Sequence, residues 1–298
     1  MRLMLTGARG QVGWELARSL MPLGEVLALD RAACDLSRPE TLAARVAELA
    51  PDVIVNAAAY TAVDKAESEE ALATRINGEA VGELARLARA RGALLVHYST
   101  DYVFDGSKPA PYVESDAVAP LNAYGRGKLA GEQAIAASGC DHLVFRTTWV
   151  YAARGGNFVR TMLWLGAERE ALRVVADQIG APTWARNIAD ATAQIVAQAM
   201  RERRDGRFES GVFNLAGGGE TNWCEFARTI FDEASRVLPG WQRKVTTVEA
   251  IGSGDYPTPA HRPLNSRLDQ RRLAERFGVV LPDWRVALLR CLEELGER

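Results

Sequence analysis

Short apolar runs alternate with longer amphipathic stretches through the first half of the chain. This alternation is typical of parallel strands joined by crossover helices. Each run has about the length of a strand and is rich in Val, Leu or Ile. We predict strands over residues 2–6, 25–29, 53–56, 93–98 and 142–146.

Helical periods lie between these runs. In the first of them, Val12, Leu16 and Leu20 recur every four residues and make one apolar face. Residues 70–91 are rich in Ala, Leu, Glu and Arg, have strong helix propensity and stop at Gly92, a residue suited to end a helix. The pattern predicts an α/β fold with a Rossmann-type, doubly wound parallel sheet.

The regular alternation loosens after about residue 150, and glycine and proline turns become frequent. Helices are predicted over 187–200, 221–237 and 286–295, and strands over 212–215 and 245–248. Residues 105–121 carry three prolines and no period, so we expect an extended surface loop over the strand ends. We expect a dinucleotide-binding Rossmann domain over 1–150, to which parts of the later chain return, and a smaller C-terminal α/β substrate-binding lobe over 151–298.

Composition and charge exclude several classes of partner. The 298 residues include 36 basic and 38 acidic side chains, so the net charge of −2 does not favour nucleic acid or an anionic membrane. No stretch approaches the roughly 18 apolar residues of a membrane span, and Gly7 comes before a signal segment could form. Four scattered cysteines and three scattered histidines match neither a disulfide framework nor a metal-binding spacing. We therefore expect a cytoplasmic protein without a metal.

Three glycines follow the first predicted strand and open the first predicted helix. Gly7, Gly10 and Gly13 have the spacing G-x-x-G-x-x-G. A pyrophosphate can bind the N–H groups of a helix start only where no Cβ blocks the backbone. We assign Gly7 to the turn, Gly10 to the close approach and Gly13 to the contact between helix and strand. An ordinary tight turn is the alternative for this spacing by itself.

An acidic residue ends the second predicted strand. Asp30 lies twenty positions past Gly10, where its carboxylate can accept hydrogen bonds from both hydroxyls of an adenosine ribose. The same charge repels a 2′-phosphate, so Asp30 favours NADH over NADPH. Arg31 next to it can offset part of that repulsion, which leaves both cofactors open. A strand-end carboxylate or helix cap is the alternative for Asp30.

Tyr124 and Lys128 stand four positions apart and share one face if this segment is a helix. A free phenol has a pKa of about 10, which makes it a slow proton donor at neutral pH. An ammonium about 4 Å away supplies about 4 kcal/mol at an effective dielectric of 20, enough to bring that pKa near 7. The pair therefore predicts a proton donor and its electrostatic partner, with a surface pair on a helix as the alternative.

The fourth predicted strand runs into Ser99 and Thr100. Residues just past the carboxyl ends of parallel strands build the sites of α/β folds. The Thr100 hydroxyl can donate to a substrate carbonyl oxygen, although a loop or cap hydroxyl fits the sequence as well. Gly125 and Gly127 each cost about 1 kcal/mol inside a helix. Close approach of cofactor or substrate would compensate for them.

With these residues in place, the chain resembles the dTDP-4-dehydrorhamnose reductase family of extended short-chain dehydrogenases/reductases over nearly its whole length. Two long motifs, at 56–67 and 99–106, distinguish this family from the wider group better than the tyrosine and lysine pair does. The matching segments are 7–13, 56–67, 99–106, 124–132, 146–151, 178–183 and 262–266.

The resemblance implies NAD(P)H-dependent reduction of the C4 ketone of dTDP-4-dehydro-L-rhamnose to dTDP-L-rhamnose, for lipopolysaccharide O-antigen biosynthesis. It makes Tyr124 the proton donor, Lys128 its partner and a ribose ligand, and Thr100 the donor to the carbonyl. Asp101 and Trp149 would contact the dTDP-sugar, although a buried strand-end aromatic also explains Trp149. The residues expected to line the dinucleotide are Gly10, Gln11, Val12, Asp30, Asp35, Leu36, Ala59, Tyr60 and Thr61.

Some members of the family hold a divalent metal at a dimer seam with acidic residues from helices. Glu15 and Glu294 match two of these positions, but Arg186 stands where a third acid is expected. A cation facing a cation removes the reason for that site. We predict no structural metal, and a monomer or weak homodimer.

Two other interpretations stay open. One relative of the family is a non-catalytic subunit that binds methionine adenosyltransferase, although the set of Thr100, Tyr124 and Lys128 argues against a purely regulatory protein. The same chemistry could also serve another nucleotide keto-sugar reductase or an epimerase. In the later part of the chain, the residues near Trp184, Asn214 and Arg262 are expected to help hold nucleotide and sugar, without showing which base they select.

Overall fold

A parallel sheet forms the centre of the computed structural model, which describes residues 1–297. Its six strands run in the order β10-β5-β4-β3-β1-β2, and each neighbouring pair is parallel. This confirms the predicted doubly wound α/β fold and places the reversal of strand order between β1 and β3. The strands are β1 (Arg2–Thr6), β2 (Glu25–Leu29), β3 (Val53–Asn56), β4 (Leu94–Thr100), β5 (His142–Thr147) and β10 (Gly211–Asn214).

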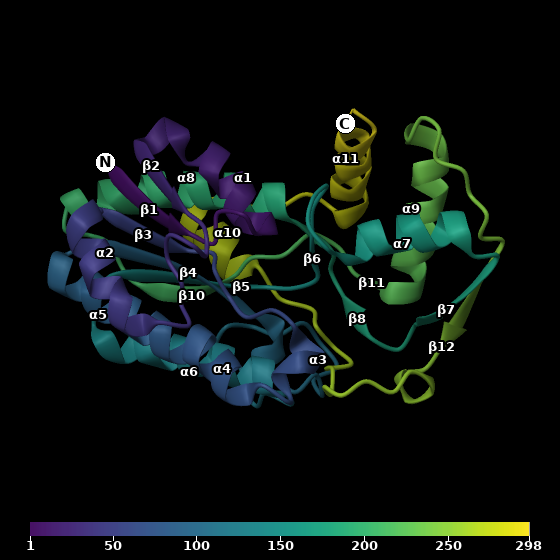
Figure 1. Ribbon diagram of the computed structural model, residues 1–298, viewed down its shortest axis with the longest axis horizontal. Coiled ribbons are helices and arrows are strands. Elements are labelled where there is room, and N and C mark those ends of the chain that lie inside the picture. Colours follow the sequence, from purple (N-terminus) through teal and green to yellow (C-terminus); the bar gives the residue numbers. More distant parts are fainter. Residues whose placement is uncertain (298) are drawn as a thin grey trace.

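Helices cover both faces of the sheet (Figure 1). Leu3 and Leu5 of β1 pack with α1, α8 and α10, whereas Met4 between them packs with α2, α5 and α6 on the other face. Strands buried on both faces are apolar at successive positions, which is why they appear in the sequence as unbroken apolar runs. These helices are α1 (Gln11–Ser19), α2 (Leu42–Leu49), α5 (Ala80–Arg91), α6 (Ala123–Ser138), α8 (Ala185–Arg204) and α10 (Arg271–Phe277).

The helix predicted over 70–91 is interrupted. A π-helical segment, Arg75–Glu79, separates α4 (Glu70–Thr74) from α5, and Gly92 ends the stretch with φ +69°. The short helix α3 (Val63–Ala66) precedes them. π-helical turns are frequent at functional sites. Ile76 of this segment lines the cleft described below.

The later chain builds a second hydrophobic cluster beside the sheet, around buried side chains such as Tyr151, Phe226 and Trp284. β7 pairs in parallel with β12, which spans 247–251 rather than the predicted 245–248. The elements are β6 (Val150–Tyr151), α7 (Phe158–Glu168), β7 (Ala171–Val175), β8 (Ile179–Gly180), β9 (Thr183–Trp184), β11 (Thr221–Asn222), α9 (Trp223–Val237), β12 (Thr247–Ile251) and α11 (Trp284–Gly296).

Parts of the later chain return to the sheet. β10 adds a strand beside β5, and α8 and α10 pack on the face that α1 covers. In Figure 1, α7, α9 and α11 stand on the side of the molecule away from β2. The predicted helices over 187–200, 221–237 and 286–295 correspond to α8, α9 and α11 with small shifts at their ends. A division near residue 150 into cofactor and substrate parts stays a proposal.

The predicted loop over 105–121 contains no helix or strand, but it is anchored. Tyr112 within it is 3% exposed and forms an isolated bridge with Leu268. Its ring stacks on Phe104 with 4.2 Å between centroids. The loop is therefore partly a core element.

Across residues 1–297, the helices are too short or too polar to span a bilayer.

Candidate active site

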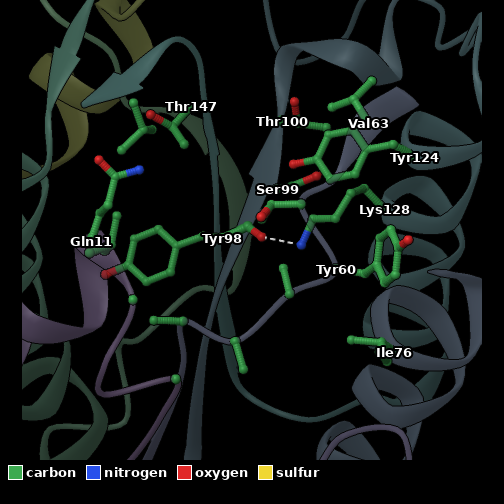
Figure 2. Close-up of a pocket in the computed structure, with 18 of the residues that line it drawn as sticks. Gln11, Tyr60, Val63, Ile76, Tyr98, Ser99, Thr100, Tyr124, Lys128 and Thr147 are labelled. Carbon is green, nitrogen blue, oxygen red and sulfur yellow. Dashed lines mark hydrogen bonds between the residues drawn. The ribbon is translucent and has the colours of Figure 1, made fainter. Parts of the chain in front are cut away.

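A cleft of about 760 Å³ lies at the carboxyl ends of the strands, beside Gly7 after β1 and Ala57 after β3. This is the reversal of strand order, where open α/β sheets bind ligands. The cleft brings together the glycine turn, the ends of β3 and β4, the start of α6 and the segment after β5 (Figure 2). The predicted residues that line it are Gly7, Gly10, Gln11, Val12, Asp35, Leu36, Ala59, Tyr60, Thr61, Thr100, Asp101, Tyr124, Lys128 and Trp149. Gly13 and Asp30 lie outside its lining.

The glycine turn can accept a phosphate group. Gly7 has φ +70°, a conformation that favours glycine, and a Cβ on Gly13 would lie 2.1 Å from the Gly7 carbonyl oxygen. Gly10 precedes α1 without a side-chain cap, and the first turn of α1 contains no acidic residue. The N–H groups and the positive end of the helix dipole are therefore available to an anion. The residues present fit a pyrophosphate at this position.

The end of the cleft at which the adenosine was expected has different charges from those predicted. One carboxylate oxygen of Asp30 accepts a hydrogen bond from Ala33 N at 3.1 Å, and the other lies 2.9 Å from Arg9 Nη2. The cleft is lined here by Arg9 and Arg31 instead. Two guanidinium groups thus stand where an acid was expected to dominate. Arg9 was missed because its place inside the glycine motif does not reveal where its side chain lies.

Local structure explains how Tyr124 and Thr100 meet. α6 starts at Ala123 because the Oδ1 of Asn122 accepts a hydrogen bond from Gly125 N at 2.8 Å. β4 continues to Thr100, two residues past its predicted end. Figure 2 shows Thr100, Tyr124 and Lys128 on one side of the cleft, with Gln11 across from them.

The electrostatic environment of Tyr124 shifts its pKa upward, whereas the sequence predicted a downward shift. Burial and the nearby Asp101 raise the pKa of Tyr124 to about 12, and the neighbouring Thr100 hydroxyl lowers it by less. The prediction that Lys128 lowers this pKa toward 7 is wrong for the ligand-free structure, because Lys128 is itself buried and desolvated. A phenol with a raised pKa keeps its proton at neutral pH.

Lys128 lies beneath the cleft with 1% exposure. Its Nζ donates a hydrogen bond to the Tyr98 carbonyl oxygen at 2.5 Å, drawn in Figure 2, and lies 3.0 Å from His97 Nε2. Burial lowers the pKa of Lys128 to about 7, and the Glu132 carboxylate opposes that shift. The ammonium and the neutral amine are therefore both accessible near neutral pH.

Asp101 follows β4 directly and is 3% exposed. Burial raises the pKa of its carboxyl group to about 6, although the nearby hydroxyls of Ser266, Thr100 and Thr148 lower it. No donor within residues 1–297 reaches its Oδ2 in good hydrogen-bond geometry. A buried acceptor without a donor costs about 1–3 kcal/mol. This oxygen is well suited to accept a hydrogen bond from a bound molecule.

The glycines at the start of α6 serve contacts within the chain. A Cβ on Gly125 would lie 2.2 Å from the Tyr102 carbonyl oxygen, whereas one on Gly127 would have no neighbour nearer than 3.4 Å. The expected close approach of cofactor or substrate does not explain Gly125, because the crowding comes from the backbone after β4. That close packing brings the α6 residue Tyr124 up to Thr100.

Trp149 leaves β5 with φ +46°, in the left-handed region that is strained for residues with a Cβ. Its ring stacks on Trp223 with 3.6 Å between centroids and 15° between planes. Both indoles line the cleft. Glycine at position 180 makes room for this stack, since a Cβ there would lie 2.6 Å from the Trp149 ring. Trp223 was missed because it arrives from the start of α9, far along the chain.

Three residues expected to hold nucleotide or sugar lie outside the cleft lining. Trp184 is 6% exposed within the second hydrophobic cluster. Asn214 is fully buried and its Nδ2 donates to the Tyr112 carbonyl oxygen at 2.8 Å. Arg262 pairs with Asp64 at 2.7 Å. The structure gives Trp184 and Asn214 packing roles instead.

Arg186 on α8 lies between two carboxylates. Its Nε is 3.1 Å from Glu15 Oε2 and its Nη2 is 3.1 Å from Glu294 Oε2. A guanidinium thus takes the position that a divalent cation would need, so these residues do not fit a shared metal ion. Within residues 1–297, no group of three or more His, Cys, Asp or Glu side chains could hold a metal ion. That the protein has no structural metal stays a prediction.

Comparison with known proteins finds one family along nearly the whole chain. A family model described as RmlD substrate binding domain matches residues 1–297. A dTDP-4-dehydrorhamnose reductase from Burkholderia thailandensis is 56% identical over 296 residues, which cover 99% of each chain. A solved dTDP-4-dehydrorhamnose reductase from Clostridium acetobutylicum has a TM-score of 0.89 at 34% identity and covers 99% of each chain.

A second solved structure, the dTDP-4-dehydrorhamnose reductase from Bacillus anthracis in complex with NADP, has a TM-score of 0.86 at 34% identity. The match covers 98% of this chain and 99% of that one. The similarity therefore includes the sheet, the cleft and the second cluster alike. With a family match over residues 1–297 and a relative that is 56% identical along nearly the whole chain, the protein belongs to the RmlD substrate binding domain family.

Proposed function

We propose that the protein is a dTDP-4-dehydrorhamnose reductase, which reduces the C4 ketone of dTDP-4-dehydro-L-rhamnose to the alcohol of dTDP-L-rhamnose with NADH or NADPH. The observation that carries this is the meeting of Tyr124, Thr100 and Asp101 with the glycine turn in one cleft. Several curated relatives with that activity align with 99% of this chain.

The chain provides a place for each part of a dinucleotide. The turn of Gly7 and Gly10 and the start of α1 would hold the pyrophosphate, and Lys128 would hold the nicotinamide ribose from beneath. Ala59, Tyr60 and Thr61 line the cleft after β3. The bound, reduced nicotinamide supplies a hydride to C4.

Tyr124 supplies the proton that the alkoxide forming at C4 needs. Its raised pKa suits this direction, because a proton donor has to begin the reaction protonated. The Thr100 hydroxyl, which donates to Asp101 Oδ1 at 3.1 Å in the ligand-free structure, would donate instead to the substrate carbonyl oxygen and orient it. Asp101 Oδ2 would accept from a sugar hydroxyl.

The stacked indoles form an aromatic wall for the sugar nucleotide. Trp149 and Trp223 lie where the cleft meets the second hydrophobic cluster. Aromatic faces bind bases and sugar rings through their large apolar area. We assign the dTDP-sugar to this wall. Assays with dTDP-linked and UDP-linked keto-sugars test whether it selects the base.

Both cofactors fit the adenosine end. The Asp30 carboxylate is engaged by Ala33 N and Arg9, so it repels a 2′-phosphate less than the sequence implied. Arg9 and Arg31 line the same region and carry the opposite charge. We therefore propose use of NADH and NADPH rather than a preference for NADH. Values of KM for the two cofactors with one sugar substrate test this proposal.

The decisive test is Tyr124→Phe, which removes the hydroxyl and keeps the ring. We expect kcat to fall by about 10²-fold or more, while the Kd for NADPH stays within about threefold, because only the proton donor is lost. Tyr256→Phe, at a side chain that is 59% exposed, is the matched control and keeps full turnover. Near-normal turnover by Tyr124→Phe would remove Tyr124 from its assigned role.

The chemistry of the cleft favours this function over a regulatory subunit, which needs no proton donor or carbonyl ligand. Release of one oxidised cofactor per sugar reduced would separate the reductase from an epimerase, which keeps and recycles its cofactor. We further propose that the enzyme acts in the cytoplasm as a monomer or weak homodimer. Light scattering of the protein over a range of concentrations tests the oligomeric state.

A further inference from the structure

The segment between β6 and α7 contacts the start of α1. The guanidinium carbon of Arg154 lies 3.4 Å from the ring centre of Trp14 on α1. Gly155 has φ +72°, and a Cβ on it would lie 3.3 Å from Cγ of Gln11. Asn157 Nδ2 donates a hydrogen bond to Gln11 Oε1 at 3.0 Å. The later chain therefore touches the helix whose first turn is proposed to hold the pyrophosphate.

Backbone partners fix which way the amide of Asn157 faces. Its Oδ1 accepts a hydrogen bond from Arg160 N at 3.2 Å, which caps α7. Its Nδ2 donates to the Ala152 carbonyl oxygen at 2.8 Å. A backbone N–H can only donate and a carbonyl oxygen can only accept, so the amide cannot turn round without losing both contacts. Nδ2 is therefore the atom that faces Gln11.

The orientation of Asn157 in turn determines that of Gln11. An amide nitrogen donates and does not accept, so the atom of Gln11 that faces Asn157 Nδ2 has to be the carbonyl oxygen. The Nε2 group of Gln11 then points the other way. Figure 2 shows this nitrogen on the side of Gln11 that faces Thr100 and Tyr124 across the cleft. Because Gln11 lines the cleft, it presents N–H groups to a molecule bound there.

An N–H donor suits the ligand proposed for this position. Gln11 is the first residue of α1 and directly follows Gly10, beside the proposed pyrophosphate site. Ionised phosphate oxygens accept hydrogen bonds, and an amide oxygen turned toward them would repel them. A Gln11 side chain that rotated freely would lose that freedom when the cofactor bound, at a cost in affinity. The bond from Asn157 removes the wrong orientation and orders the side chain before binding.

We propose that Asn157 is a positioning residue for the dinucleotide, which holds the Gln11 amide with its nitrogen toward the cleft so that Gln11 donates to a phosphate oxygen of NADH or NADPH. The cofactor site then includes a residue of the later chain, which a division near residue 150 would assign to the substrate part. The inference rests on the proposed use of a dinucleotide and is independent of which keto-sugar is reduced.

A cap for α7 is the competing explanation of Asn157, and the chain offers a matched comparison for it. Asn222 caps α9 in the same way, since its Oδ1 accepts a hydrogen bond from Glu225 N at 2.9 Å. Serine and threonine cap helices too, but their side chains are shorter and carry no amide nitrogen. Replacement of either asparagine by serine therefore keeps a cap, and only the change at position 157 removes a donor to Gln11.

Asn157→Ser should raise the Kd for NADPH about fivefold, because the Gln11 side chain then has to be ordered on binding. Titration of NADPH fluorescence measures this Kd. The KM for NADPH should rise with it, while kcat at saturating NADPH stays near the wild-type value, because Asn157 does not touch the reacting atoms. Asn157→Thr repeats the measurement if the serine variant does not fold. Asn222→Ser is the control, and its Kd should stay within about twofold of wild type.

A double-mutant cycle tests whether Asn157 acts through Gln11. Gln11→Ala alone should raise the Kd for NADPH about tenfold or more, because it removes the donor itself. Asn157→Ser in that background should add less than about twofold, since the side chain to be positioned is gone. A merely structural role of Asn157 would instead add its full effect to that of Gln11→Ala.

An unchanged Kd in both Asn157 variants would overturn the inference, as would effects of Asn157→Ser and Gln11→Ala that simply multiply. A wild-type protein that binds neither NADH nor NADPH would overturn it as well. Binding needs no sugar. A protein that shows the expected pattern of Kd values but never reduces the keto-sugar would therefore refute the proposed reductase and leave the role of Asn157 intact.

Discussion

At the residue scale, burial shifts the pKa values of the titratable groups in the cleft more than contact between opposite charges does. Burial raises the pKa of Asp101 to about 6, lowers that of Lys128 to about 7 and raises that of Tyr124 to about 12. Each shift favours the uncharged form, as expected where water is excluded. Shifts of this size are typical of functional sites, and they lower the stability of the fold.

Asp101→Asn should therefore stabilise the protein while it impairs activity. Between about pH 4 and pH 6 the folded state binds a proton at Asp101 that the unfolded chain has released, so the free energy of unfolding falls as pH rises through this window. Asp101→Asn has no carboxyl group at this position, so its free energy of unfolding does not fall in this way as pH rises. Its advantage over the wild type should grow from near zero at pH 4 to at most about 3 kcal/mol at pH 7.5.

Urea unfolding of both proteins at these two pH values measures the difference. Asp255→Asn, at an exposed position, is the control and should show no such growth. A difference between Asp101→Asn and the wild type that is the same at both pH values would show that Asp101 is not protonated early in the folded protein.

At the element scale, the position of α6 depends on how closely its glycines let it approach other backbone. A Cβ on Gly131 would lie 2.3 Å from the Asn77 carbonyl oxygen in the π-helical segment, just as Gly125 is crowded by the segment after β4. The absence of a Cβ at these two glycines thus lets the helix pack closely against both neighbours. The helix in turn carries Tyr124 and Lys128, so its packing distance sets where these two side chains lie in the cleft.

Gly131→Ala should lower stability by about 1–3 kcal/mol, because the methyl group has to push α6 away from the π-helical segment. Gly127→Ala on the same helix has no neighbour nearer than 3.4 Å and should be neutral or stabilising by up to about 1 kcal/mol. Thermal unfolding of the two variants makes the comparison. Equal effects on Tm would mean that close backbone approach is not what requires glycine at position 131.

At the scale of the whole molecule, one guanidinium links the helices of the sheet to those of the second cluster. Arg186 of α8 binds Glu15 of α1 and Glu294 of α11. Glu15 is 1% exposed, so its charge depends on these partners. The cleft lies between the sheet and the second cluster, and this link helps to hold the two sides of the cleft in place.

Arg186→Gln should lower stability by about 1–3 kcal/mol, because it leaves the carboxylate of Glu15 buried with weaker compensation. Mg²⁺ or EDTA should not move the Tm of the wild-type protein. In the variant, Mg²⁺ should recover part of the loss, since the carboxylates can then share a cation. Arg290→Gln, which breaks an exposed pair with Glu293, is the control and should change little. A wild-type Tm that depends on Mg²⁺ would contradict this account.

Local pattern was enough for the class of fold and for many of the residues that line the cleft. The strands β1, β2 and β3 match their predicted bounds. β1 and β3 are buried parallel strands, which are apolar at successive positions, and the edge strand β2 keeps an apolar run although none of its residues is buried. The same holds for the glycine turn and for the spacing of Tyr124 and Lys128, which depend on residues close in sequence.

Features that depend on burial or on distant partners were not visible in that pattern. The direction of the Asp30 side chain and the stack of Trp149 on Trp223 join segments far apart along the chain or turn on side-chain direction. The pKa of Tyr124 moved against expectation because desolvation is a property of the packed molecule, and spacing along a helix contains no measure of it.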